Sequence, residues 1–181
     1  GKLTDELKAS ILAAQTMVVV EDLYRPYRPK RRTRATIAKE KGLEPLAKLI
    51  LEQKTEEPLE NTAKDYVSQE KEVANEQEAL AGACDILAEM ISDEADYRME
   101  IRRRTMKKGQ IVSSAKDEKA SSVYEKYYDA SEPVAQIASH RVLALNRGEK
   151  EKFLTVKIEA PEEEILRYLE KRIIRKDNNP Y

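Results

Sequence analysis

One run of side chains in this sequence is able to do chemistry, the basic segment between Leu23 and Thr36. It reads LYRPYRPKRRTRAT and holds six cationic residues and no acidic one. Guanidinium and ammonium groups at this density can contact phosphates, and exposed tyrosines can stack on unpaired bases. The side chains that we predict to contact nucleic acid are Tyr24, Arg25, Tyr27, Arg28, Lys30, Arg31, Arg32 and Arg34.

The same basic segment has a second interpretation, as an ordered connection between two helices. Its prolines favour extended backbone, and the region 52–80 carries nine acidic residues against three lysines. Arginines of the basic segment can pair with carboxylates of that region and leave little charge for a ligand. On the residues alone, phosphate contact and internal ion pairing are equal alternatives.

A second basic cluster lies at residues 98–108, where six cations accompany Glu100. Within it Arg102, Arg103 and Arg104 are candidates for auxiliary phosphate contacts. The net charge of the whole chain is only -1, so the charge is segregated along the sequence and not uniformly basic.

Candidates for catalysis and for metal binding are few. The sequence has no glycine-rich phosphate loop and no serine elbow. His140 and Cys84 are the chain's only histidine and cysteine, which excludes an internal disulfide and a Cys/His zinc site. We expect His140 to pack or cap locally, and Cys84 to be a buried, unreactive thiol. We therefore predict no enzymatic activity, no metal site and no cofactor.

The sequence gives no indication of a membrane or of secretion. No apolar run is longer than the four residues of Met17 to Val20, which is far too short to cross a bilayer, and we expect no signal peptide. A single cysteine fits a reducing compartment. We expect a cytoplasmic protein without membrane contacts.

Helical signals dominate the elements that must position the basic segment. Glycine is scarce, at 5 residues, and apolar residues recur at helical spacing. We predict a helix from Thr4 to about Leu23, and a second one that Thr33 or Thr36 caps and that ends near Gly42. Pro45 then opens a third helix, so the pair has helix-turn-helix character. The third helix begins with apolar residues, which makes it a poor reader of base sequence.

The remaining elements complete a mainly all-α prediction. Asn75 and Glu78 form a variant capping box for a long helix, and Pro161 opens the last helix. Strands are predicted only at residues 110–115 and 153–159. Apolar and polar residues alternate in the second of these stretches. We expect one multi-helical domain over residues 1–181 with a small β hairpin, and sub-lobes 1–108 and 109–181 as a finer division.

Four stretches of the sequence resemble the bacterial Tex family of transcription accessory proteins. They read VEDLYRPYRPKRRTRATIAKEKGLEPLA, ALAGACDILAEMIS, YYDASEPVAQIASHR and VLALNRGEKE, and they run in order through most of the chain. The resemblance implies a fragment of the family's helical N-terminal region. It also implies that a nuclease-like domain, helix-hairpin-helix elements and an OB-fold RNA-binding module belong to parts of the family outside this chain.

The resemblance leaves two hypotheses for function. The first is a non-enzymatic, nucleic-acid-associated domain that makes weak, sequence-independent contacts to RNA or DNA phosphates. The second is a scaffold that docks the other domains of a longer chain or the transcription machinery. Burial discriminates between them, because packed or ion-paired arginines and tyrosines favour the scaffold and an open basic groove favours nucleic acid.

Overall fold

A computed structural model describes residues 3–29, 31–55 and 57–175. Its contacts divide the chain into two compact units. Unit 1 comprises the part up to Met99 and the part from Leu169 onward, and unit 2 comprises Glu100–Tyr168. Two helices, α7 (Ala95–Lys108) and α9 (Glu162–Ile173), each contain one of the boundaries.

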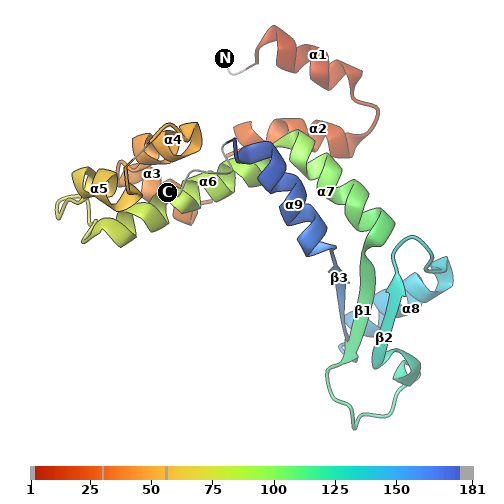
Figure 1. Cartoon of the computed structure of the whole chain (residues 1–181). Coiled ribbons are helices and arrows are strands. Elements are labelled where there is room, and N and C mark those ends of the chain that lie inside the picture. Colours follow the sequence, from red (N-terminus) through yellow and green to blue (C-terminus); the bar gives the residue numbers. More distant parts are fainter. Residues whose placement is uncertain (1–2, 30, 56, 176–181) are drawn as a thin grey trace. The chain divides into compact units, whose positions relative to one another are not determined.

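Unit 1 is built from helices (Figure 1). They are α1 (Asp5–Ala13), α2 (Met17–Tyr24), the 3-10 turn η1 (Arg25–Tyr27), α3 (Arg34–Glu40), α4 (Glu44–Glu52), α5 (Leu59–Ala63), the 3-10 turn η2 (Lys64–Tyr66), α6 (Glu76–Asp93), the first part of α7 and the last part of α9.

The start of the chain differs from the prediction of one helix from Thr4 to about Leu23. Thr4 does cap the first helix, because its hydroxyl accepts a hydrogen bond from the Leu7 amide at 3.2 Å. The helix nevertheless ends at Ala13, and Thr16 caps a new one by accepting from the Val19 amide at 3.4 Å. A threonine hydroxyl thus competes with the helical backbone and restarts the helix.

The α3–α4 pair follows the predicted sequence signals. The Thr33 hydroxyl accepts from the Thr36 amide at 3.1 Å and caps α3. Gly42 follows the helix with φ of 79°, the left-handed conformation that glycine adopts without a Cβ clash. Pro45 lies in the first turn of α4. The helix-turn-helix character of the pair stays a prediction.

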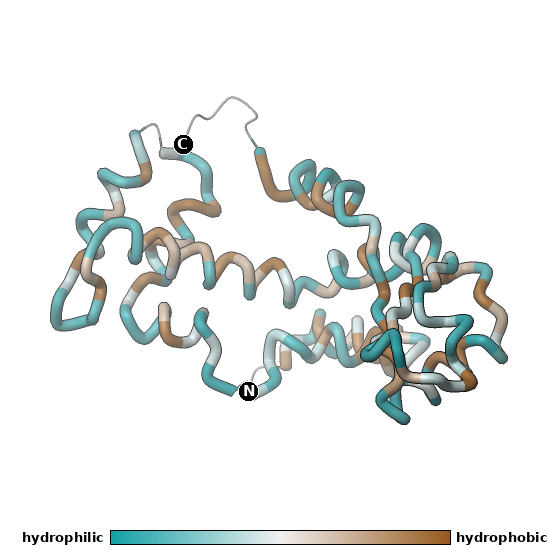
Figure 2. The backbone as a smooth tube through the Cα atoms, turned by 90° about the horizontal axis from the view of Figure 1, so that it is seen from below, coloured by the Kyte–Doolittle hydropathy of each residue, from teal (hydrophilic) through white to brown (hydrophobic). Residues whose placement is uncertain are grey.

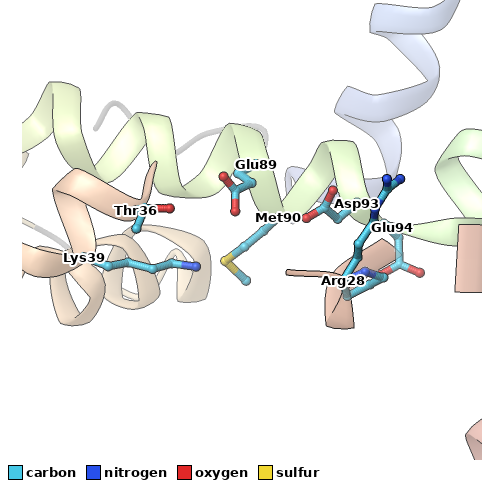
Figure 3. Close-up of a pocket in the computed structure, with 8 residues that line it drawn as sticks. Arg28, Thr36, Lys39, Glu89, Met90, Asp93 and Glu94 are labelled. Atoms are coloured by element: carbon cyan, nitrogen blue, oxygen red, sulfur yellow. The ribbon is translucent and has the colours of Figure 1, made fainter. Parts of the chain in front are cut away.

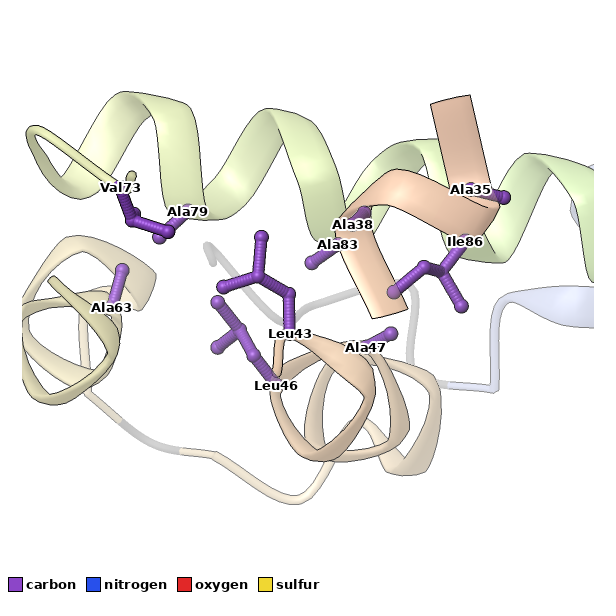
Figure 4. Close-up of a cluster of buried hydrophobic side chains, with 10 residues drawn as sticks. All are labelled: Ala35, Ala38, Leu43, Leu46, Ala47, Ala63, Val73, Ala79, Ala83 and Ile86. Carbon is purple, nitrogen blue, oxygen red and sulfur yellow. The ribbon is translucent and has the colours of Figure 1, made fainter. Parts of the chain in front are cut away.

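Small residues let the helices of unit 1 approach closely. Figure 4 shows alanines of α3 facing α6, with leucines of the turn and of α4 beside them. A Cβ built on Gly82 of α6 would lie 2.4 Å from the Leu43 Cδ1 atom, so this position has no room for a larger residue. The buried cluster consists of Ala35, Ala38, Leu43, Leu46, Ala47, Ala63, Val73, Ala79, Ala83 and Ile86.

Unit 2 contains a three-stranded antiparallel sheet in the order β2-β1-β3. Its elements are the second part of α7, β1 (Gln110–Ala115), η3 (Glu125–Tyr127), β2 (Asp129–Pro133), α8 (Ser139–Lys150), β3 (Leu154–Glu159) and the first part of α9. Val112 of β1 pairs with Ser131 on one side and with Lys157 on the other. The two strands predicted from the sequence are confirmed, and β2 adds a third that the sequence did not indicate.

The buried cluster of unit 2 lies around α8 and β3. It contains Tyr124, Tyr127, Leu145 and Leu154. The buried Ser113 hydroxyl donates to the Tyr127 carbonyl oxygen at 2.7 Å, so its burial leaves no unsatisfied donor. The brown bands in Figure 2 show that hydrophobic positions recur at intervals along the chain, as expected for helices and strands with one buried face.

The predicted fold class, mainly all-α with a small β element, is confirmed. Among the described residues, no helix combines the length and the apolar character that spanning a bilayer requires.

We predict that Gly148→Ala destabilises unit 2 by about 1–2 kcal/mol. A Cβ at Gly148 would lie 2.6 Å from Leu154 Cδ1 and 2.9 Å from its Cγ, and Leu154 is fully buried. The overpacking outweighs the roughly 1 kcal/mol that alanine gains over glycine in a helix. Chemical denaturation measures the change, and the exposed Asn146→Ala in the same helix is the control. Equal or greater stability of Gly148→Ala would contradict the packing.

Candidate nucleic-acid interface

The basic segment connects α2 to α3 within unit 1. Tyr24 is the last residue of α2, and η1 follows it directly with Pro26 in its first turn. The backbone is extended again at Arg28, and Thr33 caps α3. The predicted site residue Lys30 lies outside the described residues.

Arg25 forms an ion pair that stabilises the fold. Its Nε donates to Oδ1 of Asp93 at 3.0 Å, and the Asp93 side chain is only 11% exposed at the end of α6. A buried carboxylate needs a cationic partner, because water no longer solvates its charge. Arg25 therefore attaches η1 to α6 and is removed from the set of phosphate ligands.

Arg32 and Arg34 also meet carboxylates, but at the surface. Arg32 Nη2 lies 2.8 Å from Glu40 Oε2, and Arg34 Nε lies 3.4 Å from Asp85 Oδ1. The arginine side chains are 69% and 86% exposed. Exposed pairs of this kind are worth about 0–1 kcal/mol, so a phosphate can replace the carboxylate at little cost.

Among the described residues of the segment, Arg28 and Arg31 are the most available cations. Both are exposed, and neither makes an ion pair with a residue that the structure describes. Tyr24 and Tyr27 expose 49% and 37% of their surface, which leaves ring area for a ligand. The segment is thus neither fully ion-paired nor a continuous open basic groove.

A pocket of about 460 Å³ lies between η1, α3 and α6, and we call it the η1–α6 pocket. Figure 3 shows Lys39 and Met90 pointing toward one another in it, with Glu89 above them and Arg28, Asp93 and Glu94 together at the other end. Its lining residues are Pro26, Arg28, Thr36, Lys39, Glu89, Met90, Asp93 and Glu94. The pocket therefore mixes carboxylates with cations and is not a basic groove.

The second basic cluster, residues 98–108, is also used internally. In unit 1, Arg98 Nε donates to Oδ1 of the buried Asp22 at 2.7 Å and joins α7 to α2. In unit 2, Arg103 binds Glu100 with two hydrogen bonds of 2.7 Å. Auxiliary phosphate contacts by Arg103 would have to break this bidentate pair.

Arg104 is the centre of a charged network within unit 2. It donates at 2.7 Å to Glu100 and at 2.7 Å to Glu164 of α9, and its guanidinium lies 4.9 Å from the centre of the Tyr168 ring. Hydrogen bonding by Arg103, and then by Arg104, lowers the pKa of Glu100 to about 2. Lys108 donates to Glu164 and, with Arg104, lowers the pKa of that carboxyl group as well.

The two candidate reactive residues, Cys84 of unit 1 and His140 of unit 2, are not part of the basic segment. His140 is exposed in the first turn of α8, one residue after Ser139. The expectation of a buried thiol is wrong, because Cys84 is exposed on α6. Ala83 and Ile86 point into the core, so Cys84 is rotated out of the buried stripe despite its apolar neighbours. Among the described residues, no group of three His, Cys, Asp or Glu side chains is arranged to hold a metal ion.

The sequence missed five residues that the fold adds to the candidate site. Lys39 reaches the η1–α6 pocket from α3, and Glu89, Met90, Asp93 and Glu94 reach it from the end of α6. The residues from the end of α6 are far from the basic segment in the sequence, and Lys39 lies in the helix that follows the segment. A local signal existed only for Lys39, which lies on the exposed face of the predicted second helix.

Comparisons with known proteins agree on one family. A family model described as Tex central region-like matches residues 53–178. The chain is 52% identical to the Uncharacterized protein YdcI of Bacillus subtilis (strain 168), over 96% of this chain and 25% of that protein. It is 37% identical to the Transcriptional accessory protein Tex of Neisseria gonorrhoeae, over 86% of this chain and 20% of that protein.

A more distant relative comes from a eukaryote. The chain is 30% identical to the S1 RNA-binding domain-containing protein 1 of Homo sapiens, over 87% of this chain and 16% of that protein. The chain thus spans about a quarter or less of the length of these curated relatives.

We predict that Arg98→Ala lowers the free energy of unfolding of unit 1 by about 2–3 kcal/mol, because it withdraws the cation paired with the buried Asp22. The matched control is Arg34→Ala, which breaks a highly exposed pair and should stay within about 0.5 kcal/mol of the parent. Urea denaturation measures both variants. Equal effects would contradict the distinction between structural and surface arginines.

We predict that Glu100 stabilises unit 2 at neutral pH and loses this effect in acid. The folded-state pKa of Glu100, about 2, lies below the ordinary 4.5. The stabilisation is therefore complete above pH 4.5 and declines as the pH falls from 4.5 toward 2. The stability difference between the parent and Glu100→Gln should therefore shrink over this range. Glu163→Gln, which alters an exposed pair on α9, is the control and should show little difference at any pH.

Proposed function

Because the chain belongs to the Tex family, we propose that it is the non-enzymatic, nucleic-acid-associated helical part of a transcription accessory protein. Its basic segment makes weak, sequence-independent contacts to the phosphates of RNA or single-stranded DNA. Arg28 and Arg31 provide the first contacts, Arg32 and Arg34 add to them, and Tyr24 and Tyr27 offer rings for stacking. Arg25 belongs to the support of the segment.

The observation that carries this proposal is the exposure of Arg28 and Arg31 without an ion pair to any described residue. A cation that a protein uses only for stability is normally paired or packed. Two such arginines three residues apart, next to the weakly paired Arg32 and Arg34, form a surface that gains by neutralising phosphates.

The relatives' names support the same class of function. One relative is named as a transcriptional accessory protein, and another is named for an S1 RNA-binding domain. The absence of catalysis is part of the proposal. It is supported by the position of the only histidine and the only cysteine, which belong to different units.

A scaffold role is the second candidate, and one observation favours it. Helix α1 buries none of its residues. Leu12 in its last turn is 77% exposed, and Met17, which begins α2, is 72% exposed. A helix of 9 residues is only marginally stable in water without tertiary contacts. Docking against another domain of a longer chain, or against the transcription machinery, would cover this surface.

We predict that the 181-residue chain binds single-stranded RNA at low salt and that the affinity falls steeply as salt is added. Replacing Arg28 and Arg31 together by Ala should weaken binding. It should also make the fall of log K with log salt less steep, with a slope smaller in magnitude by about 1.4, because each phosphate contact to a single strand contributes about 0.7. Fluorescence anisotropy with a labelled oligonucleotide measures both effects.

The control for this prediction replaces Lys116 and Lys119 by Ala, which removes the same charge from an exposed loop of unit 2. This control should bind like the parent. No binding at low salt, or an equal loss in the control, would overturn the phosphate-contact proposal and leave the scaffold role as the better one.

A further inference from the structure

We infer that the η1–α6 pocket receives one unpaired nucleobase of a bound single strand, and that it prefers bases with an exocyclic amino group. This inference rests on the proposed function, because the strand must first be held by the basic segment. It goes further by assigning a base-reading role to Glu94 and an apolar platform to Pro26 and Met90.

The pocket has the size and the apolar surface that a base requires. Its volume of about 460 Å³ falls within the roughly 300–1,000 Å³ typical of small-ligand pockets. Met90 is 44% exposed and points into the pocket (Figure 3), and Pro26 lines it from η1. A thioether makes favourable contacts with aromatic rings, and a proline ring offers a flat apolar face.

The three carboxylates of the pocket have different availability. Asp93 is engaged by Arg25 at 3.0 Å, and Glu89 accepts from the Thr33 hydroxyl at 2.8 Å. The Glu94 side chain is exposed and makes no hydrogen bond or ion pair with a described residue. Glu94 is therefore the carboxylate whose oxygens are available to a ligand.

An ionised carboxylate only accepts hydrogen bonds, so Glu94 selects for donors on the base. Adenine, cytosine and guanine each present an amino group, and guanine adds a ring N–H beside it. Uracil presents one ring N–H between two carbonyl oxygens, which a carboxylate repels. Glu and Asp accept from the amino group of cytosine in known base contacts, so the chemistry is established.

The charges of the pocket favour a neutral group inside and phosphates at its rim. Its described lining includes three carboxylates and two cations, Arg28 and Lys39, and Arg25 offsets Asp93 from outside the lining, so the charges balance and a phosphate inside gains no net attraction. Neither Lys39 nor Arg28 makes an ion pair with a described residue. Both can hold the phosphates that flank a base seated between them.

The test compares labelled A15, C15 and U15 RNA on the 181-residue chain at low salt, measured by fluorescence anisotropy. We expect A15 and C15 to bind about fivefold more tightly than U15, which is near the lower end of the discrimination that a base contact provides. Glu94→Ala should remove this preference and leave the U15 affinity equal or higher, because it deletes a negative charge. Asp96→Ala removes the same charge two residues away, does not line the pocket, and should keep the preference.

A second measurement locates the base. The chain has four methionines, so Met90 can be followed by its methyl signal in an NMR spectrum. Saturation with A15 should move the Met90 signal through the ring current of the base and leave that of Met106 in place. An unmoved Met90 would overturn the inference and point to a protein ligand for this pocket.

The outcomes separate the two proposals. Equal binding of A15 and U15, with the loss in the Arg28 and Arg31 variant preserved, would overturn the base pocket and leave the phosphate contacts standing. A preference that survives Glu94→Ala would likewise overturn the assignment of Glu94. If none of the oligonucleotides binds even at low salt, both proposals fail together.

Discussion

The pairing of Arg25 with Asp93 is the interaction on which the candidate interface depends. Asp93 ends α6, where the carbonyl end of the helix already disfavours negative charge, and its carboxylate is buried. A cation must therefore be supplied from elsewhere in the chain, and Arg25 supplies it from η1. This pair holds η1 beside the end of α6, so Pro26 and Arg28 line a pocket with side chains of α6.

The same principle divides the basic residues into two groups according to the burial of their partners. Arg25 and Arg98 pair with buried carboxylates, and removing either withdraws a cation from a charge in a poorly solvated place. Arg32 and Arg34 meet exposed carboxylates, which water solvates almost as well without them. A count of positive charge along the sequence does not separate these two groups. Only the burial of the paired carboxylates distinguishes arginines that stabilise the fold from arginines that can bind a ligand.

The sequence predicted local features well and non-local ones poorly. Caps at Thr4 and Thr33, the turn at Gly42 and the family resemblance were all predictable, because each depends on a few adjacent residues. The strand β2 was missed because its sequence, DASEP, lacks the alternation and the β-branched residues that favour strands. The η1–α6 pocket could not be predicted, since it forms only when α3 packs on α6 through alanines and Gly82.

Phosphate binding and base reading place opposite demands on a surface, and our proposals assign them to adjacent places of unit 1. Phosphates require cations in the open, where released counterions add to the affinity, and the basic segment provides them. A donor-bearing base requires hydrogen-bond acceptors, and Glu94 offers one in the same pocket as the apolar side chain of Met90. Because Arg25 is paired with Asp93 and does not line the pocket, its charge is not available to an anion there. The pair that stabilises the fold thus also keeps the pocket from becoming a simple anion site.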